Sequence, residues 1–318
     1  MNQQLSGDNR SVVRAGMCTA LVVVLSLLGF YMPILSTVVF LLIPLPIAYL
    51  GMTEGVKWSL VVMTGILILD STFFGVVSAA FVCAIFGLLG VVMGICYRYK
   101  VSASHTLIAG AIVVLLALIA EGIATLYLLG LPTLMFGGEG MAQMKEAMME
   151  TLPSFYTGDA LSQAKEKVEF LMDAMEKSVP YTLIAVSFFY SWASMTLGSR
   201  VFQKMGITDI PHLPPFERWQ LPKAALVLYL FVIAGQLGFQ DNEDISYVVY
   251  NVGILCTSIF WLQGLATLWW LPHQYPIVRP LRVFIILLSA FIGFVQMFVV
   301  FLGIADMALD YRKKRNYQ

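Results

Sequence analysis

Two acidic residues stand inside long apolar stretches of this sequence, where an ionised side chain is costly to bury. Asp70 lies near the end of the third stretch, and Glu121 lies well inside the fifth. An ionisable group in such a position commonly marks a ligand-binding site or an ion pathway. We therefore take Asp70 and Glu121 as candidate ligand-binding residues. Two alternatives stand beside this hypothesis: Asp70 caps a helix end at the surface, and Glu121 is neutral or hydrogen-bonded to a neighbouring helix.

No constellation typical of a catalyst accompanies these acids. The sequence contains neither the GxxxxGKS/T pattern of a P-loop nor the HExxH pattern of a zinc protease, and its three histidines are isolated. We expect no enzyme activity, no metal site and no cofactor. The lack of a basic, aromatic-interleaved surface argues against a nucleic-acid partner. We interpret the cysteines as small buried apolar residues; they are Cys18, Cys83, Cys96 and Cys256.

The elements that must position the acids are apolar stretches long enough to cross a lipid bilayer. A helix needs about 20 apolar residues to cross the bilayer core, and charged residues make up only 12% of the chain. The sequence predicts an all-α integral membrane protein, a polytopic helical bundle of eight to nine apolar segments. The stretches are Val12–Tyr31, Leu35–Met52, Trp58–Phe74, Val76–Tyr97, Leu107–Leu129, Tyr181–Val201, Ala224–Phe239, Tyr247–Leu271 and Val283–Ala305.

The distribution of Lys and Arg predicts the orientation of these spans. Basic residues in short loops mark the cytoplasmic side, and Arg10 and Arg14 precede the first stretch. We expect a multi-pass protein of the bacterial inner or plasma membrane with its N-terminus in the cytoplasm. A ninth full crossing would carry the cationic run 311–315 outside. We therefore favour a last stretch that is broken, near Gly293, or interfacial; the alternative is a tail that departs from the rule.

Three regions follow one another along the chain. Residues 1–202 form a six-helix half that includes an outer segment, 131–178; residues 203–222 form a proline-rich inner loop; and residues 223–318 form a helical extension with a basic tail. Ala160–Lys177 has the pattern of an amphipathic helix. Its apolar stripe is Leu161, Ala164, Val168, Leu171 and Met175. Two interpretations are open for this helix: a solvated cap on the outer face, or a lid at the membrane interface.

Two further features are candidate interaction sites. Small residues let helix backbones approach closely, and Ala15, Gly16 and Ala20 near the start of the first span are candidate partner-docking residues. The inner loop carries an interfacial motif, which comprises Pro214, Pro215, Phe216, Arg218, Trp219 and Pro222. Its prolines forbid a regular helix, and its aromatic rings suit the headgroup layer. It is either an interfacial anchor or a docking site for a cytoplasmic protein partner.

Two phrases of the sequence resemble a known family. They are Leu213-Pro-Pro-Phe-Glu-Arg-Trp-Gln-Leu-Pro-Lys223 and Gly303-Ile-Ala-Asp-Met-Ala-Leu-Asp-Tyr-Arg312. Both resemble the YybS-type family, bacterial multispanning proteins that form a domain of unknown function. This resemblance covers essentially the whole chain and implies a membrane protein, but no reaction.

The N-terminal half also resembles the substrate-binding (S) component of energy-coupling-factor vitamin transporters. The likeness rests on Arg14-Ala-Gly-Met-Cys-Thr-Ala-Leu21, on the proline-containing second stretch and on the glycine-rich fourth. It implies six spans with both ends inside, and a first helix whose small residues contact a coupling subunit. An AxxxA step is typical there, and the matching positions here are Gly16 and Ala20.

These observations support two hypotheses of different classes. The first is a membrane component that binds or transports a small-molecule ligand, with the lipid bilayer and a membrane protein as partners. The second is a non-transport scaffold or regulatory partner that acts through the proline-rich inner loop and the cationic tail.

Overall fold

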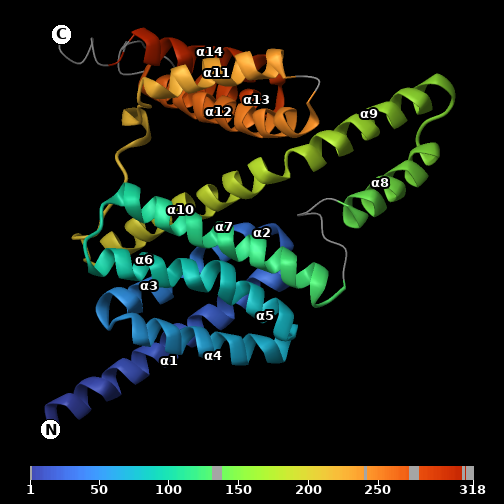
Figure 1. The fold of residues 1–318 in the computed structure, drawn as a ribbon. Helices are drawn as coiled ribbons and strands as arrows, with labels where there is room; N and C mark the ends of the chain where they lie inside the picture. The colour runs from blue at the N-terminus through green and yellow to red at the C-terminus, as the bar shows by residue number, and fades with distance from the viewer. Residues whose placement is uncertain (1, 131–137, 240–241, 272–278, 310–311, 313–318) are drawn as a thin grey trace. The chain divides into compact units, whose positions relative to one another are not determined.

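The computed structural model describes residues 2–130, 138–239, 242–271, 279–309 and 312. All regular secondary structure within these residues is helical. The chain divides into two compact units, Met1–Glu169 with Thr182–Leu213 and Phe170–Tyr181 with Pro214–Gln318. The helices (Figure 1) are α1 (Asn2–Tyr31), α2 (Pro33–Leu42), α3 (Pro44–Thr53), α4 (Val56–Phe74), α5 (Val76–Val82), α6 (Leu88–Arg98), α7 (Ala103–Tyr127), α8 (Glu139–Thr151), α9 (Gly158–Lys177), α10 (Val179–Lys204), α11 (Ala224–Gly238), α12 (Glu243–Trp270), α13 (Arg279–Phe291) and α14 (Gly293–Leu309). Short turns are η1 (Cys83–Gly87), η2 (Leu152–Ser154) and η3 (Phe216–Arg218).

The predicted all-α membrane architecture is confirmed. Six helical segments of the described chain are long and apolar enough to cross a membrane, and a bent pair of helices raises the number to seven if it counts as one span. Two of the nine predicted stretches do not reach that standard. Helix α11 has 15 residues, which rise only about 22 Å against a bilayer core of about 30 Å. Helix α10 is long enough, but its serine, threonine and tyrosine residues lower its hydropathy.

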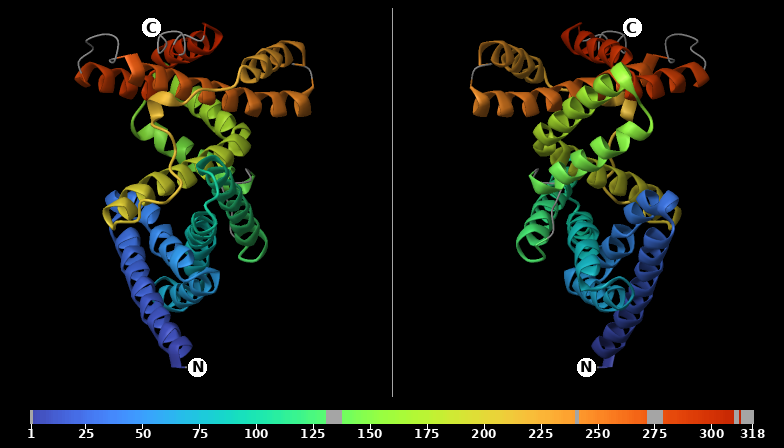
Figure 2. Two further views of the ribbon diagram at one scale, coloured as in Figure 1. Left: turned by 90° about the vertical axis from the view of Figure 1, so that its left-hand side faces the viewer. Right: turned by 90° about the vertical axis from the view of Figure 1, so that its right-hand side faces the viewer.

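The first unit is held together by close packing of α3 on α6 and of α1 on α4. Helix α1, the long blue helix of Figure 2, also contacts α2 and α3. A Cβ on Gly90 would lie 2.7 Å from the Pro44 carbonyl oxygen, and a Cβ on Gly94 would lie 2.9 Å from that of Ala48. The glycines of the fourth apolar stretch therefore pack helix on helix within the chain, as small residues commonly do in membranes.

The predicted amphipathic helix of the outer segment is present as α9, and only part of its predicted apolar stripe is buried. Val168 and Met172 are buried, whereas Leu171 and Met175 are exposed. The buried face follows the spacing 161, 164, 168 and 172, close to the 3.6-residue period of the helix. Leu171 lies one residue, about 100°, away from Met172 on the helix surface, whereas Met175 lies on the same side as Val168 and is exposed near the end of the helix.

The second unit is built around α12, which packs against α11, α13 and α14. Helix α14 crosses α12 at two glycines. A Cβ on Gly264 would lie 1.9 Å from the Val299 carbonyl oxygen, and a Cβ on Gly303 would lie 2.2 Å from that of Phe260. Helices α13 and α14 meet at a bend of 112°. The predicted break of the last apolar stretch near Gly293 is therefore confirmed.

Candidate functional site

Asp70 is the most unusual side chain of the first unit. It lies on α4 with no exposed surface, so it does not cap a helix end at the surface. Ser26 of α1, also fully buried, lies beside it. The Ser26 hydroxyl interacts with the Asp70 carboxyl, but none of these three oxygen atoms has a partner with full hydrogen-bond geometry among the described residues. Buried polar groups are normally hydrogen-bonded, so this pair leaves hydrogen-bonding capacity that the protein itself does not fill.

A distorted helix lies next to the Asp70–Ser26 pair. Cys83, an electrostatic neighbour of Asp70, is the first residue of η1, a π-helical turn between α5 and α6. Its thiol lies 3.6 Å from the carbonyl oxygen of Met63 and donates a weak hydrogen bond to it. Such π-turns inside α-helices are rare and occur frequently at functional sites.

A row of aromatic rings runs from this pair across the first unit. Phe30 lies one helical turn beyond Ser26, and Phe74 lies one turn beyond Asp70. Their rings stack with centroids 4.1 Å apart. The row continues through Phe40, 5.5 Å from Phe30, and then through Phe86, 5.4 Å from Phe40. Helices α1, α2 and α4 and turn η1 thus all contribute a ring, which we call the aromatic row.

Glu121, the second predicted acid, stands near the other end of the aromatic row. Tyr190 of α10 makes an edge contact with Phe86 at 5.3 Å, and its phenol is an electrostatic neighbour of Glu121. One carboxyl oxygen of Glu121 is buried without a partner among the described residues, although the side chain as a whole is half-buried. Among the described residues, no hydrogen bond links Glu121 to Asp70. The two acids are related only through the aromatic row, which ends at Phe86 beside Tyr190, the neighbour of Glu121.

The start of α1 is fixed by a polar cluster around Glu54, which lies just after the second candidate membrane span. The Ser11 hydroxyl donates a 2.6 Å hydrogen bond to Glu54, and the Arg14 guanidinium pairs with the other oxygen of that carboxyl. These two contacts, the serine hydrogen bond foremost, hold the pKa of Glu54 below its ordinary value. The cluster ties the start of α1 to the end of α3.

The structure separates the three predicted docking residues of α1. Ala15 is buried in the core of the first unit. Gly16 and Ala20 are exposed, and nothing lies within 4 Å of a Cβ built on Gly16. Only the latter two therefore lie on a face of the unit that a partner helix could contact.

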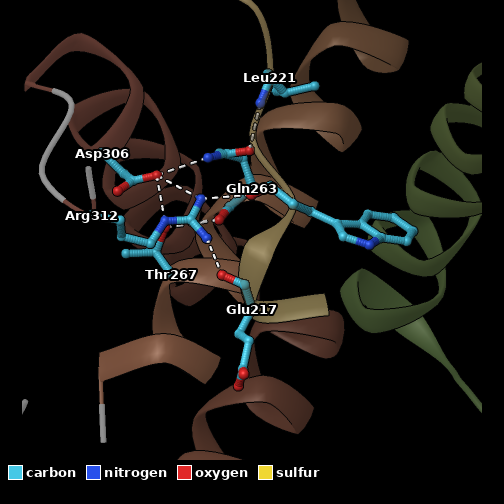
Figure 3. Close-up of polar contacts among 7 residues, drawn as sticks. Glu217, Leu221, Gln263, Thr267, Asp306 and Arg312 are labelled. Carbon is cyan, nitrogen blue, oxygen red and sulfur yellow. Dashed lines mark hydrogen bonds and ion pairs between the residues drawn. The ribbon is translucent and has the colours of Figure 1, made fainter. Parts of the chain in front are cut away.

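The second unit contains the densest polar network of the described chain (Figure 3). Arg312 and Asp306 form a buried ion pair, with the Arg312 Nη2 and Nε atoms 2.7 and 2.9 Å from one oxygen of the Asp306 carboxylate. The same oxygen accepts a 2.8 Å hydrogen bond from the amide of Gln263. Only 1% of the Arg312 side chain and 3% of the Asp306 side chain are exposed. Buried ion pairs of this kind are stable only when well hydrogen-bonded.

This network binds the proline-rich loop. Arg312 donates to the carbonyl oxygens of Glu217 and Trp219, at 2.6 and 2.7 Å. The backbone N–H of Leu221 donates to the side-chain oxygen of Gln263. Since this loop precedes α11, Arg312 lies at the same end of the α11–α12 pair as the loop. That arrangement fits a re-entrant α13–α14 pair rather than a full crossing.

The loop motif itself is an irregular segment with internal contacts. The indole N–H of Trp219 donates to the carbonyl of Pro214 at 3.0 Å, and its ring makes an edge contact with Phe216. Pro215, Arg218 and Pro222 are exposed. The loop's backbone is thus engaged within its own unit, while these three side chains remain accessible.

The comparisons with known proteins agree with this architecture. Residues 20–307 match the model of a family described as "Predicted membrane protein (DUF2232)". The chain belongs to this family. One relative is the protein named "Uncharacterized protein YybS" of Bacillus subtilis (strain 168), which is 22% identical over 316 residues, covering 96% of this chain and 99% of that protein. No solved structure matches the chain. The predicted YybS-type membership is confirmed, and the family match includes both Asp70 and Asp306.

The sequence did not single out Ser26, Asp306 or Arg312 of this DUF2232 chain as site residues. Ser26 is one of many serines in the sequence. The only feature that distinguishes it is that Phe30 follows one helical turn later. Asp306 and Arg312 stand six residues apart in the family-like C-terminal phrase. Arg312 belongs to the basic tail, where solvent exposure is the usual expectation.

Proposed function

We propose that this protein is a non-catalytic membrane component that binds a small molecule within its first helical unit. The observation that carries the proposal is the Asp70–Ser26 pair. An acidic residue inside a membrane helix is costly, and the cost reaches about 2.5–3.5 kcal/mol at the helix centre on insertion scales. A fold that keeps such a residue with no partner leaves hydrogen-bonding capacity for a ligand.

Three other features support the proposal. The first unit supplies the closely packed helices on which S-component-like proteins are expected to bind ligands. The π-helical turn and the aromatic row lie next to the acid. Gly16 and Ala20 present an exposed small-residue face to which an energising membrane partner could dock. Arg10 and Arg14, which lie in the N-terminal part of α1, support an orientation in which that face is near the cytoplasmic side.

Native mass spectrometry of the purified full-length protein tests the proposal. We expect the wild-type protein to retain a small molecule from native membranes and the Asp70→Asn variant to lose it. Asp209→Asn is the matched control, because Asp209 is an exposed acid of the same unit, paired with Lys100. A protein with no retained mass, or with one that both variants keep, contradicts the proposal.

A further inference from the structure

We propose that the ligand of the Asp70 site carries a protonated amine, held by the carboxylate of Asp70 and the hydroxyl of Ser26. The proposal rests on the proposed function, and adds the chemical class of the molecule bound. Three observations carry it: the local balance of charge, the aromatic row, and the position of the site next to a glycine joint.

The helices around Asp70 supply no positive charge to balance it. Helix α4 packs against α1, α3, α5, α6 and η1. The sequence has no Lys, Arg or His from 15 to 56 or from 58 to 97. Arg14 precedes Ser26 by about 18 Å of helix, and Lys57 precedes Asp70 by about 20 Å. The other titratable side chains of these helices near the pair are cysteines and tyrosines, Cys83 being the one next to Asp70.

A positively charged ligand therefore has an attraction here that an anion or a neutral molecule lacks. A carboxylate with two unpartnered oxygens accepts hydrogen bonds from an ammonium group, and charge-assisted bonds are roughly twice as strong as neutral ones. The Ser26 oxygen is a third acceptor on the same side. A divalent metal fits less well, since no group of three or more His, Cys, Asp or Glu side chains comes together in the described chain.

The aromatic row gives the site a second means of holding an organic cation. Ring faces attract ammonium groups by cation–π interaction, typically within about 6 Å of the ring centroid. Phe30 and Phe74 stand one turn beyond the two polar residues, and their stacked faces suit the apolar part of an amine. An inorganic cation lacks the apolar part of an organic amine, which gains additional free energy from burial against these rings.

The rings of Phe30 and Phe74, next to the Asp70–Ser26 pair, lie at positions where they can move apart. Phe30 is 39% exposed, so the stack reaches the surface of the unit. Phe74 is the last residue of α4, and Gly75 joins α4 to α5 with a positive φ of 83° and open space around its α-carbon. A change of backbone angles at that glycine moves the ring of Phe74 without breaking either helix.

Three probes of similar size and different charge test this inference. They are phenethylammonium, 2-phenylethanol and 3-phenylpropionate, added to the full-length protein in detergent at constant ionic strength while its melting temperature is recorded. We expect phenethylammonium alone to raise the melting temperature in a saturable manner. Asp70→Asn should weaken its apparent affinity about ten- to hundredfold, as loss of a hydrogen bond to a charged group does. Ser26→Ala should weaken it less, and Asp209→Asn should bind as the wild type does.

Any result other than these contradicts the inference. Equal stabilisation by the alcohol or the acid shows that charge does not select the ligand, and an equal effect of NaCl or KCl shows an inorganic cation site. Ammonium binding that survives Asp70→Asn places the site elsewhere. If that variant does not fold, unchanged binding by Ser26→Ala decides against the proposal. A retained native ligand that depends on Asp70 but is not an amine refutes this inference and leaves the proposed function standing.

Discussion

Replacing Arg312 by alanine is expected to destabilise the second unit strongly. The substitution removes two hydrogen bonds to the Asp306 carboxylate and one each to the carbonyls of Glu217 and Trp219. Asp306 then keeps a single partner, the amide of Gln263. Breaking a buried ion pair by removing one member typically costs about 3–5 kcal/mol, because a buried charge is left uncompensated. For a protein of this size we expect a drop in melting temperature of about 5–15 °C.

Two measurements check the reasoning behind this value. Thermal unfolding in mild detergent gives the drop, and limited proteolysis of the loop at residues 214–221 shows whether the loop is released. Arg218→Ala is the matched control, since Arg218 lies exposed on the same loop. The double variant Asp306→Asn with Arg312→Met should recover part of the stability, because no orphan charge remains. If Arg312→Ala melts like Arg218→Ala, or if the double variant is no better than the single one, the argument is wrong.

Three further predictions concern packing, pH and docking. Gly264→Ala should lower the melting temperature, since its Cβ would meet a backbone oxygen at 1.9 Å and overpacking typically costs about 1–3 kcal/mol. Glu54→Gln should destabilise the protein at neutral pH; the pKa of Glu54 is lowered by folding, so its contribution is present above the ordinary value of 4.5 and is lost as the pH falls through the folded-state pKa. Gly16→Leu with Ala20→Leu should preserve the fold and remove a copurifying membrane partner.

Each of these three has a control within the chain. Gly238→Ala should melt as the wild type, since nothing lies within 4 Å of its Cβ position. The difference between wild type and Glu54→Gln should shrink below pH 4.5; a constant difference across the titration would refute its assignment to the carboxylate. Ala15→Leu should unfold the first unit because Ala15 is buried. A double variant of the exposed pair that also unfolds would show that those residues pack within the chain.

The helical class, the family and the break near Gly293 could be predicted from the sequence. Each of them depends on residues that lie close together along the chain. Apolar length sets a membrane helix, and the four consecutive cationic residues after the last stretch argued against a full crossing. Glycine steps such as Gly90 and Gly94 could be assigned to helix packing for the same reason. These properties need no knowledge of which helix lies next to which.

The partners of the polar residues could not be predicted because they depend on tertiary register. Ser26 and Asp70 meet only when α1 and α4 pack in one particular rotation. The sequence alone predicts that Arg312 is solvent-exposed in the basic tail. Its burial depends on the loop carbonyls of Glu217 and Trp219, whose position the sequence does not show. The burial of individual α9 residues could not be predicted for a related reason: an apolar stripe does not show where neighbouring helices pack, and Met172 is buried while Leu171 is exposed.

The protonation state of Asp70 tests the central claim most directly. Difference infrared spectroscopy of the full-length protein distinguishes an ionised carboxylate from a protonated carboxyl, and subtraction of the Asp70→Asn spectrum isolates this residue. With phenethylammonium bound, we predict an ionised Asp70 carboxylate; after its removal, we predict that the carboxyl takes up a proton because no other positive charge is near. A carboxyl that remains protonated whether or not the amine is present would contradict the account.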